Sequence, residues 1–246
     1  MAQAADAAAV ASFELEFRDG HDNLERIRLG DAVSYPFWKV SPVRRFPASQ
    51  RQRNLHVFEV FSKTSKLVRC ESLLESHAVL ISDFDPDVKD LASQPFRLYA
   101  SFEDRSRMRH VPDLFELLAD GRRRVVDVTL ASKRDLPERK ALFAVTQQLC
   151  EAAGWEYEVR QELPPAVLAN IRDLSAFRRE PMHLDRYRGP LLRAFLVPQS
   201  LVAANEVGPP ALVRPVLFHL LWRRELAVDL TQPLTQDSMV AIGRVA

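Results

Sequence analysis

Between Glu71 and Gln161 the spacing of apolar residues changes in a set order, and this order restricts the folds open to the chain. The segment ESLLESHAVLISDF has helical spacing, and DPDVKDLASQ is expected to break the helix. FRLYASF and the two arms of VPDLFELLADGRRRVVDVTL alternate as strands, with a tight turn at Ala119-Asp120-Gly121. LPERKALFAVTQQLCEAAG then has helical spacing with Gly154 at its end, and WEYEVRQ is expected as a last strand. Helix, three strands, helix, strand predicts an α/β fold with a mixed sheet and a crossover helix.

The rest of the chain predicts further parts on either side of this segment. We expect a β-rich N-terminal lead-in at residues 1–41, a central domain at 42–162 and a C-terminal helical domain at 163–246. The second boundary follows from the LPP sequence, after which the pattern becomes helical and polar. The closing segment predicts a helix and two short strands across a proline turn. That order suits a winged-helix-like domain, although many folds end in the same way.

The composition allows a large core but does not by itself indicate a ligand. Of the 246 residues, 47% are hydrophobic, which is enough to bury a core. The formal net charge is only +1, so nucleic-acid binding would require local basic patches. The segment SPVRRFPASQRQR, between the expected strands FELEF and NLHVFEVF, carries Arg44, Arg45, Arg51 and Arg53. These arginines are candidates for phosphate contacts, with a solvated loop as the simpler interpretation.

Cysteine usage and hydropathy predict a cytoplasmic protein. Cys70 and Cys150 are isolated, without the spacing of a zinc site or a disulfide framework. The alanine-rich segment MAQAADAAAVAS lacks the basic N-terminal residues of a secretory signal and contains Asp6. No apolar run approaches the roughly 20 residues that span a bilayer.

Three acidic residues are candidates for a metal-dependent hydrolytic site. Hydrolysis of a phosphodiester with a divalent metal needs clustered carboxylates, because Mg²⁺ prefers oxygen ligands. Asp113 and Asp127 lie on the two arms of the predicted hairpin and can approach across it, and Glu75 in the preceding helix can complete the cluster. Simpler roles are open for two of them: Glu75 can close a capping box with Ser72, and Asp113 can start a strand after Pro112. Asp127 lies between valines in a strand expected to be buried, where a carboxylate needs partners or a metal.

Four motifs in this order resemble those of the TnsA-like endonuclease subunits of heteromeric transposases. Residues 72–96, SLLESHAVLISDFDPDVKDLASQPF, resemble the opening of that family's catalytic domain. This stretch has an acidic residue in a serine-leucine-glutamate helix, then D-P-x-V and a glutamine before the next strand. VPDLF and VVDV resemble the second and third motifs, and CEAAGWEYEV resembles the helix-glycine-strand segment after them. The resemblance runs from Pro42 to Arg160 and is looser in the C-terminal part.

The resemblance implies both a fold and an activity. The family belongs to the restriction-endonuclease-like PD-(D/E)xK group, with an αβββαβ core, so residues 42–162 are expected to form the catalytic domain. Glu75, Asp113 and Asp127 match the acids that bind Mg²⁺, for which Mn²⁺ can substitute. The implied reaction is DNA cleavage at the 5′ ends of a mobile element. The implied partners are element-end DNA, an integrase-like transposase subunit that cuts and joins the 3′ ends, and an AAA+ ATPase regulator contacted through the C-terminal part.

One position departs from the family pattern. A lysine is expected two residues after the third acid, where it activates the attacking water and offsets charge on the phosphate, but this chain has Thr129. Lys133 or Arg134 can fold back from beyond the strand end to supply the cation, and we include Lys133 among the predicted catalytic residues. Alternatively, the metal alone activates the water at a reduced rate, or the site is degenerate.

Two non-catalytic hypotheses therefore stay open. In the first, the same scaffold binds DNA or partner proteins through arginines near the hairpin, which are Arg105, Arg107, Arg109 and Arg122 to Arg124. In the second, the chain is a winged-helix regulator fused to a β-rich domain. Arg223 and Arg224 favour that idea, although their position at a predicted helix end also suits the helix dipole.

Overall fold

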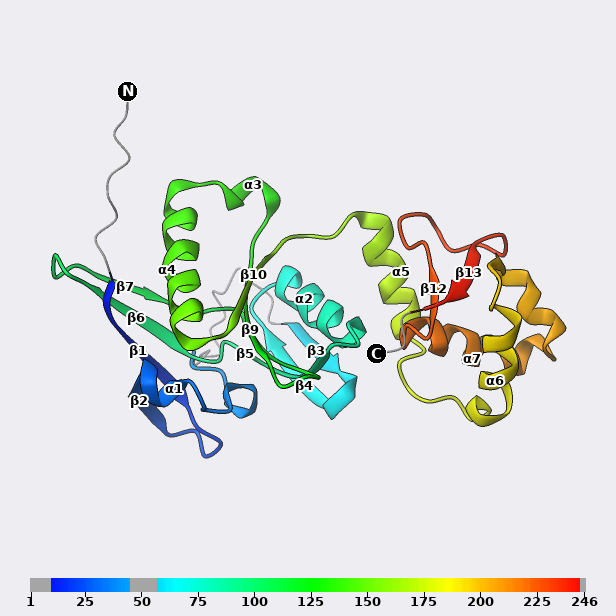
Figure 1. Cartoon of the computed structure of the whole chain (residues 1–246), viewed down its shortest axis with the longest axis horizontal. Helices are drawn as coiled ribbons and strands as arrows, with labels where there is room; N and C mark the ends of the chain where they lie inside the picture. The colour runs from blue at the N-terminus through cyan, green and yellow to red at the C-terminus, as the bar shows by residue number, and fades with distance from the viewer. Residues whose placement is uncertain (1–9, 45–56, 244–246) are drawn as a thin grey trace, which may run out of the picture. The chain divides into compact units, whose positions relative to one another are not determined.

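The computed structural model describes residues 10–44 and 57–243 of the chain, which has a mixed α/β fold (Figure 1). Arg45, Arg51 and Arg53 lie outside the described residues. The chain forms two compact units that interleave along the sequence. Unit 1 comprises Met1–Glu59, Leu67–Val79 and Val88–Glu162, and unit 2 comprises Val60–Lys66, Leu80–Asp87 and Leu163–Ala246. Within the described ranges, no helix has the length and apolar character needed to cross a membrane.

The first sheet of unit 1 has four strands in the order β10-β9-β8-β5. These strands are β5 (Val88–Ser93), β8 (Leu114–Leu118), β9 (Arg123–Val128) and β10 (Glu156–Arg160). β8 pairs antiparallel with β5 and with β9, whereas β10 pairs parallel with β9. The parallel pair requires a crossover, and α4 (Pro137–Ala153) supplies it after the short helix α3 (Ala131–Arg134). The predicted mixed sheet with a crossover helix is therefore present.

Local sequence signals account for the ends of these elements. α4 has a proline in its first turn and ends at Gly154, whose φ of +69° suits a residue without a side chain. The β8–β9 hairpin turns through Gly121, with a φ of +87°. α2 (Leu73–Phe84) lies within the helix predicted before the strands. Its residues as far as Val79 belong to unit 1, and those from Leu80 onward belong to unit 2.

The helix ends at DPDVKDLASQ as predicted, because α2 stops at Phe84, but the same segment also contains β5, which was not predicted. A register shift between Val88 and Asp90 interrupts the regular alternation of side chains, and both Leu91 and Ala92 are buried. A period-two pattern is therefore not visible in the sequence. FRLYASF does form a strand, β6 (Arg97–Phe102), but it belongs to a different sheet.

That second sheet of unit 1 is antiparallel and has the order β2-β1-β6-β7. Its strands are β1 (Val10–Arg18), β2 (Leu24–Arg28), β6 and β7 (Arg107–His110). The predicted N-terminal lead-in thus supplies two strands to a sheet that also contains β6 and β7. The short elements α1 (Leu29–Ala32) and η1 (Phe37–Lys39) follow β2. One aromatic-rich core joins residues of both sheets and α4, and its largest members include Phe17, Phe37, Phe96, Phe115 and Trp155.

A buried ion-pair network crosses the first sheet. Glu116 of β8 is fully buried, and its carboxylate contacts Arg160 of β10 at 3.3 Å and Arg124 of β9 at 3.2 Å. Arg160 also donates to the carbonyl oxygen of Ala78 in α2 at 3.1 Å and forms two hydrogen bonds of 2.9 Å with Glu158. Burial opposes the charge on Arg160, but the neighbouring carboxylates of Glu116 and Glu158 dominate and raise its pKa. The network links three strands to α2.

The remaining elements include a small hairpin and unit 2. β3 (Val57–Phe61), η2 (Ser62–Thr64) and β4 (Lys66–Cys70) form a two-stranded hairpin before α2. Unit 2 continues with α5 (Pro165–Ser175), α6 (Leu184–Ala194), β11 (Gln199–Ser200), η3 (Leu201–Glu206), α7 (Pro210–Trp222), β12 (Leu226–Val228) and β13 (Met239–Ile242). The last three strands form a sheet in the order β11-β13-β12. The helix and two short strands predicted for the closing segment correspond to α7, β12 and β13.

Candidate active site

Asp113 directly precedes β8, and Asp127 is the last residue but one of β9. The antiparallel register pairs Leu114 with Val126, so the next pair outward is Asp113 and Asp127. The backbone holds Asp113 on both sides, because its N–H donates to Val126 O at 3.1 Å and its carbonyl accepts from Gln94 N at 2.8 Å. The Asp113 carboxylate accepts a 2.6 Å hydrogen bond from the N–H of Val128. The hairpin therefore brings two of the three predicted acids together.

Asp127 is buried, with 1% of its surface exposed, and both of its oxygens accept hydrogen bonds. Oδ1 lies 2.7 Å from Nε2 of His110 in β7, and Oδ2 accepts from the hydroxyl of Tyr157 in β10 at 2.6 Å. Burial and the nearby Asp127 carboxylate raise the pKa of Tyr157, so the phenol stays protonated and keeps its donor. The side-chain partners that a buried Asp127 was expected to need are present.

Glu75 lies in the first turn of α2, where Ser72 caps the helix as in the predicted capping box, but the Glu75 carboxylate reaches the N–H of Glu71 rather than that of Ser72. The N–H of Glu75 donates to Ser72 Oγ at 3.2 Å, and the Glu75 carboxylate accepts from Ser72 Oγ at 3.0 Å and from Glu71 N at 2.8 Å. Burial is the main cause that raises the pKa of Glu75. The Glu75 carboxylate thus accepts hydrogen bonds at the N-terminus of α2, although burial disfavours its charged form.

The three acids belong to one electrostatic cluster. Burial raises the pKa of Asp113 well above its usual range, and the charges of Asp127 and Glu75 raise it further. The Val128 N–H and the Arg44 guanidinium oppose this rise. Cys70 is affected by the same negative field, because burial and then Glu75 and other acids raise the pKa of its thiol to about 12. The cluster therefore concentrates negative charge in a partly buried place.

This donor set fits a hard divalent cation in its chemistry. Carboxylate oxygens are the ligands that Mg²⁺ prefers, and a cation would relieve the repulsion that acts on Asp113. Within residues 10–44 and 57–243, no three His, Cys, Asp or Glu side chains are already grouped as a metal-holding set. Protein donors occupy Glu75 and Asp127 instead. Glu75 would have to exchange its cap hydrogen bonds in order to join Asp113 and Asp127 as a ligand.

Thr129 and Lys133 both follow β9 in the chain, but they differ in exposure. Thr129 is buried, and its hydroxyl is 3.5 Å from the carbonyl oxygen of Leu130. Lys133 is exposed in α3, and its ammonium makes no hydrogen bond or ion pair with any residue that the structure describes. A nearby cation that lowers the pKa of the Asp113 carboxyl is Arg44, which also pairs with Glu71 at 2.6 Å.

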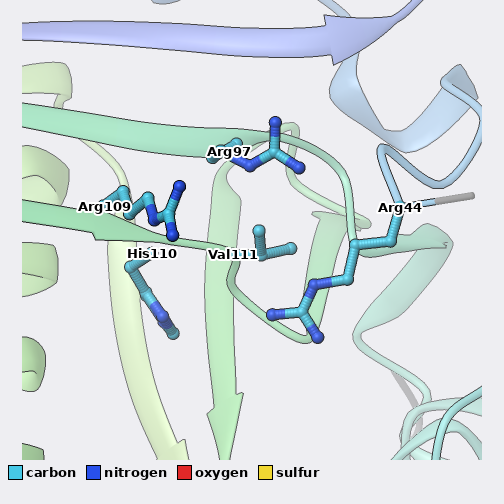
Figure 2. Close-up of a pocket in the computed structure, with 5 residues that line it drawn as sticks. All are labelled: Arg44, Arg97, Arg109, His110 and Val111. Carbon is cyan, nitrogen blue, oxygen red and sulfur yellow. The ribbon is translucent and has the colours of Figure 1, made fainter.

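A basic pocket of about 450 Å³ adjoins the acids, and we call it the arginine pocket. Its described lining consists of Arg44, Arg97 of β6, Arg109 and His110 of β7, and Val111. Figure 2 shows the three guanidinium groups arranged around Val111. His110 joins the pocket to the acids, because the same imidazole contacts Asp127. The pocket thus places positive charge next to the negative cluster.

Gln94 is a further residue of the site with unusual geometry. It is 2% exposed and has a φ of +47°, which is uncommon for a residue with a side chain. Its backbone bridges the site, since its N–H donates to Asp113 O at 2.8 Å and its carbonyl accepts from Val43 N at 3.0 Å. Within the described part of the chain, its Oε1 atom is buried without a hydrogen-bond partner. Strain and an unpaired polar atom often mark functional positions.

Sequence reasoning did not identify His110, Tyr157, Gln94 or the role of Arg97. His110 and Tyr157 reach Asp127 from strands 17 and 30 residues away in the chain, and no local pattern reports such contacts. The only sequence signal for His110 is its position three residues before Asp113. For Gln94, the signal is its place within the stretch that resembles the TnsA-like motif.

Comparisons with known proteins add no family assignment. A scan against protein-family models and a search of the curated proteins each found no match for this chain. The functional argument therefore rests on the residues and on their geometry.

Proposed function

We propose that the chain is a metal-dependent DNA endonuclease subunit of a heteromeric transposase, similar to TnsA, that hydrolyses phosphodiester bonds at the 5′ ends of a mobile element. One observation carries the proposal: Asp113 lies across from Asp127 in the β8–β9 hairpin, is repelled by Asp127 and Glu75, and lies close to an arginine pocket. Metal-assisted phosphodiester cleavage requires carboxylates that can hold a cation beside basic groups that can contact the phosphate. The acid cluster and the arginine pocket provide these two kinds of group.

The element order supports the same proposal. α2, β5, β8, β9, α4 and β10 follow the αβββαβ order of the restriction-endonuclease-like group, and β6 and β7 are then an insertion after the first strand of the core. The order α7, β12, β13 in unit 2 is compatible with a winged-helix-like domain. In this proposal, unit 1 carries the chemistry, and unit 2 contacts an AAA+ ATPase regulator and the integrase-like transposase subunit.

The residues of the chain have distinct roles in this proposal. Bound Mg²⁺, or Mn²⁺ in its place, would polarise the phosphodiester and lower the pKa of an attacking water. Asp113 and Asp127 would hold the ion, with Glu75 as the third ligand. His110 and Tyr157 orient the Asp127 carboxylate, and the Val128 N–H orients that of Asp113. Lys133 is proposed to supply the cation that Thr129 cannot supply.

The test is a cleavage assay with the purified chain and its transposase partner on element-end DNA. We expect nicking at the 5′ ends that requires Mg²⁺ or Mn²⁺ and that is lost in Asp113→Ala. Asp31→Ala is the matched control, because Asp31 is exposed in α1 of the same unit. Absence of metal-dependent nicking, or nicking that survives Asp113→Ala, would sink the proposal.

A second candidate function is a catalytically degenerate scaffold that binds DNA or a transposition partner. The observation that favours it is Thr129, which is buried at the position of the usual lysine. Titration calorimetry with Mn²⁺ separates the two functions. If the chain binds Mn²⁺ and Asp127→Ala abolishes this binding, the nuclease is supported. If the chain binds no Mn²⁺ but still binds DNA, the scaffold is supported.

A further inference from the structure

We infer that the arginine pocket, together with the outer face of β6 and β7, binds the phosphodiester backbone of a nucleic-acid strand. The inference shares its substrate class with the proposed function but does not depend on the cleavage step. It assigns a binding role to Arg97, Arg107 and Arg109, which lie outside the acid cluster.

Strand register places the relevant side chains on one face. β6 and β7 pair Tyr99 with Arg109, and Ser101 with Arg107. Since side chains alternate along a strand, Arg97 shares this face with Tyr99, Arg107 and Arg109. Residues of the opposite face, such as Leu98 and Ala100, belong to the core. The arginines therefore lie on the outer face of the second sheet.

These arginines differ in how far their charge is already neutralised. Arg97 pairs with Glu16 of β1, and Arg44 pairs with Glu71. Arg107 and Arg109 are exposed, and neither forms an ion pair or side-chain hydrogen bond with any residue in the described ranges. Arg107 and Arg109 thus have no counter-charge among the described residues, and they lie beside the pocket arginines Arg44 and Arg97. Together they form a local positive patch on a chain whose net charge is only +1.

The chemistry of this patch suits phosphate groups in series better than a single small anion. A guanidinium presents a planar fork of donors that matches phosphate oxygens. Arg107 and Arg109 are two residues apart, a rise of about 6.8 Å along an antiparallel strand. One nucleic-acid strand carries a charge every 3.4 Å or so of helix axis, so this spacing corresponds to about two nucleotides. Repeated anions along a backbone can thus occupy successive arginines.

The path of β7 connects this surface to the acids. The strand ends at His110, and Val111 and Pro112 lead directly to Asp113. The four residue-to-residue steps from Arg109 to Asp113 span at most about 14 Å, or about four nucleotides at the same axial rise. His110 also contacts Asp127. A strand held on the arginines would therefore pass close to the carboxylate cluster.

The test measures DNA binding by the full-length chain in EDTA, so that no metal-dependent step contributes. The probe is a short fluorescent DNA duplex without terminal phosphates, titrated at several salt concentrations. Arg109→Ala is expected to weaken binding about tenfold, the loss that goes with one charge-assisted hydrogen bond. It should also make the slope of log affinity against log salt shallower by about 1, since one phosphate contact is lost.

Two further variants make the result specific. Arg139→Ala removes the same charge from an exposed position on α4 that has no side-chain partner among the described residues, and its binding should match that of the wild type. Arg109→Lys keeps the charge and should restore part of the affinity. Equal losses in Arg109→Ala and Arg139→Ala, or no loss in either, would overturn the assignment.

The source of the phosphate is tested with two added probes. A duplex with 5′-terminal phosphates and inorganic phosphate as a competitor both report on a site for phosphomonoesters. If Arg109→Ala weakens only the duplex with terminal phosphates, the pocket binds a strand end and the backbone assignment is wrong. Because metal is absent throughout, binding can persist when cleavage fails, so the failure of this inference and that of the nuclease proposal are distinguishable.

Discussion

Asp113 and Asp127 lie near each other, but their carboxylates accept different numbers of hydrogen bonds. Asp127 accepts hydrogen bonds from His110 and Tyr157, whereas the Asp113 carboxylate accepts one from the backbone of Val128. Burial and two neighbouring acids raise the pKa of Asp113. The electrostatic cost of bringing the acids together therefore falls mainly on Asp113, as expected of a group that is stabilised when a cation binds.

Replacing Asp113 by Asn should stabilise the metal-free protein at neutral pH. A folded-state pKa above the unfolded value, which is about 3.9 for Asp, means that the folded protein holds this proton more tightly. The resulting stability is fully present below the unfolded pKa and is lost as pH rises through the folded pKa. Asn removes that loss while its amide oxygen still accepts from Val128. We therefore expect a gain in the free energy of unfolding, because the carboxylate that burial and two acidic neighbours disfavour is no longer present.

Thermal unfolding in EDTA at neutral and acidic pH measures this effect. The gain should appear as a higher Tm, and each kcal/mol corresponds to about 2–4 °C for a chain of this size. The difference between Asp113→Asn and the wild type should shrink as pH falls. Asp31→Asn should show no change at either pH, and a gain for Asp113→Asn that does not depend on pH would contradict the electrostatic explanation.

The missing lysine also leads to a prediction at a single residue. If Lys133 supplies the cation, Lys133→Ala should lower the rate of metal-dependent nicking by about 100-fold or more, the usual effect of a proton-transfer group. Lys140→Ala is the control, because Lys140 is also exposed and pairs with Asp135. An unchanged rate in Lys133→Ala would leave water activation to the metal alone.

Among the secondary-structure elements, β8, β9, β10 and α2 are held together by the Glu116–Arg160 network. Glu116 and Arg160 are both buried, so each charge depends on the other for compensation. The hydrogen bond from Arg160 to Ala78 ties the sheet to the helix that carries Glu75. The position of the third acid therefore depends on a polar interaction that makes no contact with the acid itself.

Removing one partner of this network should cost more than removing both. Arg160→Leu leaves Glu116 buried with less compensation, and we expect a loss of about 3–5 kcal/mol in the free energy of unfolding. The double variant Glu116→Leu/Arg160→Leu should recover part of this loss because no unpaired buried carboxylate remains. Urea denaturation followed by circular dichroism gives the double-mutant cycle. Additive losses in the two single variants would show that the pair is not coupled.

On the scale of the chain as a whole, the two units interleave. Leu80 and Phe84 of α2 lie in the core of unit 2, although the segments on either side, Leu67–Val79 and Val88–Glu162, belong to unit 1. Phe84 contacts Trp222 of α7, with 5.2 Å between ring centroids. Cutting the chain before Leu163 would expose these apolar side chains, so the two units are not separable at one peptide bond.

A substitution in α2 should therefore destabilise unit 2. Phe84→Ala removes a buried ring, and we expect a loss of about 3–5 kcal/mol. Hydrogen exchange should speed up in peptides from α5 and α7, which share the core with Phe84. Leu73→Ala in the same helix is the control, because Leu73 is 61% exposed and should leave these peptides unchanged. Unaltered exchange in α7 of the Phe84→Ala variant would contradict the prediction.

Sequence patterns were most informative where structure depends on neighbours in the chain. The helical spacing of α2 and α4, the turn at Gly121, the helix end at Gly154 and the Ser72 cap of α2 all follow from local rules, and the structure contains them. β5 was missed because its register shift breaks the alternation on which strand prediction depends. The site residues Glu75, Asp113, Asp127 and Lys133, and the activity assigned to them, stay predictions.

By itself, the sequence determined α2, α4, the β8–β9 hairpin with its two acids, and the α/β class, since each depends on contacts within a few residues or across a tight turn. Only the tertiary structure decided that β6 pairs with β1 rather than with the core sheet, that His110 and Tyr157 hold Asp127, and that arginines from separate segments line one pocket. The physical reason is that these contacts join residues far apart in the chain. Their formation depends on how whole sheets pack, and no local spacing encodes that.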